Sequence, residues 1–294
     1  MHDRAHNYLQ LMRLDRPVGT LLLLWPTLAA LWLAAGGVPP WHLIVVFIAG
    51  TFIMRSAGCV INDFADRGWD RFVERTQDRP LTSGRVSATE ALALFAALSL
   101  LAALLLVFLN PLTRWLAVAG FAIAMLYPFT KRWTYLPQVV LGAAFSWALI
   151  MAYASVQGRV PAEAWLLFVG SLLWIVAYDT LYAMVDRDDD LRVGIKSTAI
   201  LFGNADRFMV GVLQLAALLT LALLGAQVGL GALYHLGLGG ALALFGYQQY
   251  LIRDRDRAGC FKAFRNNTWV GMVFFSGTVL DLMIGSPLGS GNPL

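Results

Sequence analysis

The sequence predicts an all-α integral membrane protein in which nine transmembrane helices surround a central cavity. Of its 294 residues, 59% are hydrophobic and only 14% are charged, which leaves too little polar surface to cover a soluble fold. Apolar runs of 18 or more residues recur along the chain, and such runs are the signature of membrane-spanning helices. Alternating strands of the barrel type are absent, so a helical bundle is the only architecture that satisfies the backbone hydrogen bonds in lipid.

The predicted spans follow the apolar runs in order. The first run is too long for the core of a signal peptide and lacks a clear cleavage site, so we count it as a retained span. We expect one domain over residues 1–294, with helices at about 18–35, 41–61, 89–109, 113–128, 136–156, 163–184, 207–226, 230–251 and 269–285.

The basic residues predict the orientation of these spans. All but Arg114 and Arg159 of the 22 Lys and Arg residues lie at the N-terminus, near the ends of the even-numbered spans, or in the loops that follow. The positive-inside rule makes this side cytoplasmic, so the N-terminus is expected in the cytoplasm. The net charge of +4 reflects this bias, and no basic stripe interleaved with aromatic residues indicates binding of nucleic acid.

Two predicted cytoplasmic loops, residues 62–88 and 185–206, are long and charged, whereas the outer loops are short and nearly neutral. Long loops in a compact protein are commonly functional, so we expect short helices here that cap the cavity. The acidic motifs at the start of these loops lie 120 residues apart. This offset suggests a pseudo-repeat of residues 14–132 and 133–252, with the span at 269–285 appended.

Two sets of polar residues mark the candidate site. Both have intervals of 3, 4 and 4 residues: Cys59, Asn62, Asp66 and Asp70, and then Asp179, Tyr182, Asp186 and Asp190. On a helix this spacing places each set on one face. Carboxylates one turn apart repel each other, and Mg²⁺ that bridges them to a diphosphate would relieve the repulsion. The metal ligands predicted are therefore Asp66, Asp70, Asp186 and Asp190, with the amide oxygen of Asn62; solvated loop carboxylates are the simpler alternative.

Two charged residues lie deeper in the predicted spans. Arg55 is seven residues before Asn62, and Asp179 is seven residues before Asp186, which places each of them about 10 Å further into the membrane on the same face. Charged groups at such depth point into a polar cavity or pair with one another. We therefore keep two interpretations: a structural Arg55–Asp179 pair, or substrate contacts in which Arg55 binds an acidic group and Asp179 positions an acceptor.

A diphosphate also needs cationic partners. Arg67 lies within the first motif, Lys131 and Arg132 follow the fourth span, and Lys196 precedes the seventh, where free backbone N–H groups favour anions. Each is also explained as a positive-inside anchor, but Arg67 and Arg132 accompany the acidic sites. Tyr182 shares the face of the second motif and is a candidate to stabilise a carbocation. The four His and two Cys residues form no recognisable metal-binding set.

These motifs resemble those of the UbiA superfamily of membrane prenyltransferases. Its signatures NDxxDxxxD and DxxxD match Asn62–Asp70 and Asp186–Asp190. The resemblance covers nearly the whole chain and is closest to the branch that prenylates 4-hydroxybenzoate. It includes the segments LMRLDRPVGTLLLLWPT, RPLTSGRVS, YPFTKRWTYLPQVVLGAAFSW, AYDTLYAMVDRDDD and GIKSTAILFG.

The resemblance implies a Mg²⁺-dependent transfer of a polyprenyl group from polyprenyl diphosphate to the ring carbon ortho to the hydroxyl of 4-hydroxybenzoate. Ionisation to an allylic cation releases diphosphate, and Asp179, Asp189 or the diphosphate itself is the candidate base. Arg55 and Arg132 are the candidates for the carboxylate of the acceptor. The family also implies a prenyl tail in a lipid-facing tunnel, a bacterial inner membrane with the active site towards the cytoplasm, and an early step of ubiquinone biosynthesis.

Two alternatives stay open. A different acceptor within the superfamily, such as haem, a naphthoate, homogentisate or a chlorophyll precursor, would use the same donor chemistry. A transporter could use the intramembrane acids and Arg55 as a coupling pathway, but transporters bind their substrates near the midplane, whereas most acids here are predicted at one face. The sequence sets neither the prenyl chain length nor the oligomeric state.

Overall fold

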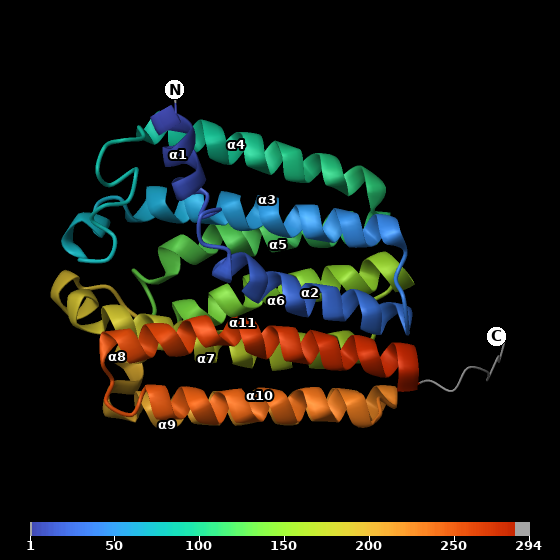
Figure 1. The fold of residues 1–294 in the computed structure, drawn as a ribbon. Coiled ribbons are helices and arrows are strands. Elements are labelled where there is room, and N and C mark those ends of the chain that lie inside the picture. Colours follow the sequence, from blue (N-terminus) through green and yellow to red (C-terminus); the bar gives the residue numbers. More distant parts are fainter. Residues whose placement is uncertain (1, 286–294) are drawn as a thin grey trace.

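The computed structural model describes residues 2–285, and this part of the chain contains helices but no strand (Figure 1). The long helices are α2 (Val18–Ala35), α3 (Trp41–Asp66), α4 (Ala88–Leu105), α5 (Pro111–Thr130), α6 (Pro137–Gln157), α7 (Ala162–Val193), α9 (Asp206–Val228), α10 (Ala232–Leu251) and α11 (Arg257–Leu280). They alternate with shorter helical segments: α1 (His2–Leu11), η1 (Asp70–Phe72), η2 (Leu106–Phe108), α8 (Thr198–Phe202), η3 (Gly203–Ala205) and η4 (Asp281–Gly285).

Eight helical segments within residues 2–285 are long and apolar enough to cross a membrane. They contain α2 to α7, α9 and α11, whereas α10 is not among them. The prediction of a multi-pass helical membrane protein is confirmed. The count of nine spans and the cytoplasmic N-terminus stay predictions.

Three of the predicted helices have different ends in the structure. The helix predicted at 41–61 continues to Asp66 as α3, and the one predicted at 163–184 continues to Val193 as α7. The final helix was expected at 269–285, but α11 begins at Arg257, because Asp256 caps its N-terminus by accepting a hydrogen bond from the Gly259 N–H at 2.8 Å. The predicted start at 269 was wrong because the first turns of α11 carry polar and basic residues, which hydropathy does not count as part of a span.

Helix α2 packs within the bundle. This helix contacts α3, α6 and α11, and its residues contribute much of the main buried cluster. Helices α10 and α11 approach closely at two glycines, since a Cβ on Gly237 would lie 2.9 Å from the Val273 carbonyl oxygen and 3.1 Å from the Gly277 Cα. By contrast, α4 packs mainly on α3 and has only Ala91 buried.

One end of the bundle carries a cap. Figure 1 shows α1, the segment 67–87 and α8 gathered at this end, where α3 and α7 also finish. Ser87 and Glu90 form a reciprocal capping box that starts α4 directly after the cap segment. The expectation of short ordered helices in the two long loops is confirmed for η1, α8 and η3, although residues 185–193 belong to α7 itself. We call α1, residues 67–87 and α8 the cap.

Candidate active site

A cavity of about 1660 Å³ extends from the cap into the bundle. Ordinary small-molecule pockets occupy about 300–1,000 Å³, so this cavity is large enough for a long substrate. Its inner part is apolar and is lined by residues of α3, α4, α5 and α6, among them Val46, Phe47, Leu105 and Phe121. Its cap end is polar. The lining there includes most of the predicted site residues, namely Arg55, Asn62, Asp66, Asp70, Lys131, Asp179, Tyr182, Asp186, Asp190 and Lys196.

The first acidic motif lies at the end of α3. Asp66 is the last residue of the helix, and Asp70 begins the 3-10 turn η1. The expectation that Asp70 shares one helical face with Asn62 and Asp66 was therefore wrong, because the helix stops before Arg67 and Gly68. The turn nevertheless keeps Asp70 in the lining of the cavity, and the residue is 6% exposed. Burial raises the pKa of this carboxyl above its ordinary value, although the nearby Arg79 guanidinium opposes the shift.

Cations balance both carboxylates of this motif. The Lys131 ammonium forms an ion pair with Asp66, and Arg79 Nη1 donates to Asp70 Oδ2 at 2.8 Å. Lys131 comes from the end of α5 and Arg79 from the cap segment, so three parts of the chain meet here. Breaking such buried pairs is costly, so they hold the ends of α3 and α5 together and keep Arg79 beside η1.

The second acidic motif lies on one continuous helix. Asp186 and Asp190 are both in α7, one turn apart, and each is 8% exposed. Arg75 of the cap segment makes a two-pronged contact with Asp186, in which Nε donates to Oδ1 at 2.9 Å and Nη2 donates to Oδ2. The Arg75 guanidinium carbon also lies 4.5 Å from the centre of the Tyr182 ring. Asp190 has no ion pair with any residue in the range 2–285.

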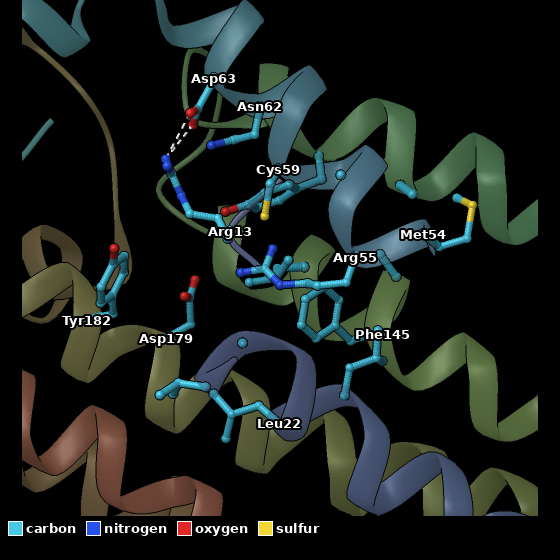
Figure 2. Close-up of a pocket in the computed structure, with 18 of the residues that line it drawn as sticks. Arg13, Leu22, Met54, Arg55, Cys59, Asn62, Asp63, Phe145, Asp179 and Tyr182 are labelled. Carbon is cyan, nitrogen blue, oxygen red and sulfur yellow. Dashed lines mark hydrogen bonds and ion pairs between the residues drawn. The ribbon is translucent and has the colours of Figure 1, made fainter. Parts of the chain in front are cut away.

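A buried carboxylate outside both faces organises the cap. Asp63, which is 2% exposed, accepts hydrogen bonds from Arg13 Nη2 at 3.0 and 2.8 Å and from Arg79 Nη1 at 2.9 Å. Arg79 therefore bridges Asp63 and Asp70. Figure 2 shows Arg13 reaching Asp63 from the segment that precedes α2. Sequence reasoning missed Arg13 and Arg75 because their partners are 50 and 111 residues away in the chain. It also missed Arg79, whose partners Asp70 and Asp63 are 9 and 16 residues away across a turn. The segment RPLTSGRVS, which begins with Arg79, was the signal closest to finding it.

The two deeper charged residues face the same region of the cavity. Figure 2 shows Arg55 reaching in from α3, and Asp179 and Tyr182 projecting from α7. No ion pair or hydrogen bond joins Arg55 to Asp179 among the described side chains, and Arg55 Nε is buried without a hydrogen-bond partner. The structure thus places both groups in the cavity without the direct structural pair that was one of the two interpretations.

Two predicted cationic residues lie outside the lining. Arg67 is exposed and donates to the Phe64 carbonyl oxygen at 2.7 Å. Arg132 is also exposed: its Nη2 donates to the Ala65 carbonyl oxygen at 3.0 Å, and its guanidinium carbon lies 4.7 Å from the Trp69 ring centre. These contacts hold both guanidiniums at the end of α3, so the structure does not bring them together with the acidic residues of the cavity. Arg67 was selected because it lies within the first motif, and Arg132 because it follows a span that ends on the same side as the acidic motifs. Neither criterion places a guanidinium in the cavity.

The oxygen-rich end of the cavity fits a Mg²⁺ ion that is shared with a ligand. Within residues 2–285 no group of three or more Asp, Glu, His or Cys side chains forms a complete metal site. Mg²⁺, however, is usually held by one or two carboxylates together with water and substrate phosphates. Asn62 Oδ1 and Asp66 Oδ1 are buried oxygen atoms without hydrogen-bond partners, and such atoms suit a hard cation.

The sequence matches the model of a known protein family. The model of the UbiA prenyltransferase family matches residues 23–276. The chain belongs to this family. Residues 23–276 contain both acidic motifs and every predicted site residue, so the match covers the whole polar end of the cavity except the contribution of Arg13 and its neighbours.

Curated relatives are similar over nearly their full length. A protein of Marinobacter nauticus named 4-hydroxybenzoate octaprenyltransferase is 57% identical over 283 residues, which cover 96% of each chain. A protein of Coxiella burnetii with the same name is 58% identical over 280 residues, or 95% of this chain and 98% of the relative.

Solved structures share the fold. The apo structure of a UbiA homolog from Aeropyrum pernix has a TM-score of 0.80 at 25% identity, covering 89% of this chain and 97% of that one. A UbiA homolog from Archaeoglobus fulgidus bound to GPP and Mg²⁺ has a TM-score of 0.71 at 16% identity, covering 95% of this chain and 100% of that one. At this identity the second likeness shows the fold alone.

Proposed function

We propose that this membrane prenyltransferase moves a polyprenyl group from polyprenyl diphosphate to the carbon ortho to the hydroxyl of 4-hydroxybenzoate. The reaction releases diphosphate and is an early step of ubiquinone biosynthesis. The names of the curated relatives support the substrates. The observation that carries the proposal is that one cavity joins a long apolar chamber to an end rich in carboxylates and cations.

The polar end would hold the diphosphate. Asp66, Asp70, Asp186, Asp190 and Asn62 are the proposed Mg²⁺ ligands, and bound Mg²⁺ would stabilise the negative charge of the leaving group. Arg75, Arg79, Lys131 and Lys196 line the same region. Charge-assisted hydrogen bonds from these side chains to phosphate oxygens would lower the barrier to breaking the C–O bond. Because Arg75, Arg79 and Lys131 are paired with carboxylates here, they would exchange these partners for phosphate as the donor enters.

The deeper part of the polar end would receive the acceptor. Arg55 is proposed to bind the carboxylate of 4-hydroxybenzoate, and Asp179 is proposed to take the proton that the attacked ring carbon loses. Asp189, the other candidate base among the side chains, is paired with Arg257 at 3.1 Å and does not line the cavity. The Tyr182 ring and the apolar walls would stabilise the allylic cation and exclude water, which would otherwise capture it.

The test is a product assay with purified protein. The protein is incubated with Mg²⁺, polyprenyl diphosphate and 4-hydroxybenzoate, and the product mass is measured; a naphthoate, homogentisate and haem are supplied separately as competing acceptors. The proposal expects prenylated 4-hydroxybenzoate to form, and to form much faster than any other product. Prenylation of another acceptor with none of 4-hydroxybenzoate would overturn the proposed substrate while leaving the donor chemistry intact.

We also propose that the protein lies in a bacterial inner membrane with the cap towards the cytoplasm. The support is the gathering of basic residues at the cap end and the positive-inside rule. Ser83→Cys in the cap segment and Gly37→Cys between α2 and α3 give a matched pair of labelling sites, because both native cysteines are buried. A membrane-impermeant thiol reagent applied from the periplasmic side should label Gly37→Cys and spare Ser83→Cys. The reverse pattern would contradict the orientation.

A further inference from the structure

A glycine lies against the guanidinium of Arg55. Gly19 is the second residue of α2, and it lines the same cavity. A Cβ atom built on Gly19 would overlap Arg55 Nη2, and it would lie 2.8 Å from Arg55 Nε and 3.0 Å from Arg55 Cζ. These distances are far inside normal contact, so no side chain larger than hydrogen fits at position 19 while Arg55 keeps its conformation.

An aromatic ring also lies near the guanidinium. The Arg55 Cζ atom is 5.8 Å from the centre of the Phe145 ring on α6, and Figure 2 shows this ring beside the Arg55 side chain. Within the described residues Arg55 has no ion pair, and its Nε is buried without a partner. The guanidinium therefore lies against the first turn of α2 and near Phe145, and no carboxylate of the described residues pairs with it.

We propose that Gly19 is a positioning residue that determines specificity for an acidic acceptor. Its missing side chain leaves a slot in which the Arg55 guanidinium stays unpaired and directed into the cavity, where it can take the carboxylate of a small aromatic acid. This inference rests on the proposed function. It adds a residue of α2 that controls how the acceptor is recognised.

The backbone at position 19 does not itself require glycine. Gly19 is in the α-helix α2 and is not among the glycines with positive φ. In a helix, alanine is favoured over glycine by about 1 kcal/mol. The atoms that a new Cβ would meet belong to the far end of a flexible side chain. Gly19→Ala should therefore leave the protein folded and displace only the Arg55 guanidinium.

The main experiment compares the two substrates in the Gly19→Ala variant. We expect its KM for 4-hydroxybenzoate to rise at least about tenfold, and its KM for polyprenyl diphosphate to change less than about twofold. The methyl ester of 4-hydroxybenzoate carries no negative charge, so the preference of the enzyme for the acid over the ester should narrow. Gly246→Ala on α10 is the matched control, because a Cβ there meets nothing within 4 Å; both KM values should stay unchanged.

A double-mutant cycle tests whether Gly19 acts through Arg55. Once Arg55→Leu has removed the guanidinium, Gly19→Ala should raise the acceptor KM no further, because the two changes disrupt the same interaction. An equal increase in both backgrounds would show that Gly19 affects packing alone and would overturn the inference, as would an unchanged acceptor KM in Gly19→Ala.

A failure of the proposed function would give different results from a failure of the inference about Gly19. If wild-type protein makes no product from 4-hydroxybenzoate, the substrate assignment fails before any variant is compared. If wild type is active and Arg55→Leu leaves the acceptor KM unchanged, Arg55 does not bind the acceptor and the inference falls with it. Should Gly19→Ala not fold, Phe145→Leu removes the aromatic ring near the Arg55 guanidinium without altering α2. It should raise the acceptor KM selectively, and an acceptor KM and a preference for acid over ester that both stay as in wild type would overturn the proposal.

Discussion

The two acidic motifs share a spacing but are built and balanced differently. The first is divided between the end of α3 and the turn η1, and each of its carboxylates is paired, Asp66 with Lys131 and Asp70 with Arg79. The second lies on the continuous helix α7, where Asp186 pairs with Arg75 and Asp190 has no ion pair among the described residues. The same spacing therefore carries two charge balances: both carboxylates of the first motif are paired with cations, whereas the second motif presents Asp190 as a carboxylate that is free to bind a cation.

The largest expected effect is the loss of either proposed metal-binding motif. Asp66→Ala and Asp186→Ala should each reduce turnover at least about a thousandfold, because both motifs are needed to hold the metal and the leaving diphosphate. Product formation is measured at saturating Mg²⁺, and gel filtration checks that each variant stays folded. Near-normal turnover in either variant would show that the two motifs are not equivalent in catalysis.

The next largest effect is a loss of kcat/KM that should differ between arginines that line the cavity and arginines that do not. Arg75→Ala and Arg79→Ala should each lower kcat/KM about a hundredfold, as expected for losing a charge-assisted contact worth roughly 3 kcal/mol. Arg67→Ala and Arg132→Ala are the matched controls, since these exposed arginines contact carbonyl oxygens at the end of α3; less than about a threefold loss is expected. A hundredfold loss in Arg132→Ala would restore it as a substrate ligand.

A smaller effect is expected from the carboxylates that lie off the shared faces. Asp63→Asn weakens the contacts to Arg13 and Arg79, and should lower the thermal midpoint by roughly 5 °C, because a buried ion pair loses one partner. The exposed Asp188 has no ion pair among the described residues, so Asp188→Asn should leave the midpoint unchanged. Differential scanning fluorimetry in detergent measures both. Equal midpoints for the two variants would mean that Asp63 does not hold the cap.

The smallest expected effect is a change in the thermal midpoint that has opposite signs for the two motifs. Without divalent metal, Asp190→Asn should raise the thermal midpoint by about 1–2 °C, since it removes repulsion from Asp186 one turn away. Asp70→Asn should lower the midpoint, because Arg79 loses a charged partner. The thermal midpoints of both variants are measured in excess chelator. Shifts of the same sign would contradict the difference in charge balance between the motifs.

Much of this site could be predicted from sequence because its acidic residues are local. Their spacing identified the motifs, and hydropathy located most spans to within a few residues. The ion pairs could not be predicted in this way, because Arg75 and Asp186 are 111 residues apart and Arg13 and Asp63 are 50 apart. Only the packed bundle brings them together. The end of α3 at Asp66 was missed for a related reason: the pattern of acidic residues continues through a turn that is not helical. The pseudo-repeat of residues 14–132 and 133–252 stays a prediction.

The sparse packing of α4 has a consequence for the stability of the protein. Only Ala91 of this helix is buried, and Leu100, Ala103 and Leu105 line the cavity. An isoprenoid chain in that space would supply the neighbours that α4 lacks, and so act as a removable part of the hydrophobic core. Binding at a hundred times the dissociation constant adds about 2.7 kcal/mol to the stability of a folded protein. The lipid substrate would thus help to fold the helix that encloses it.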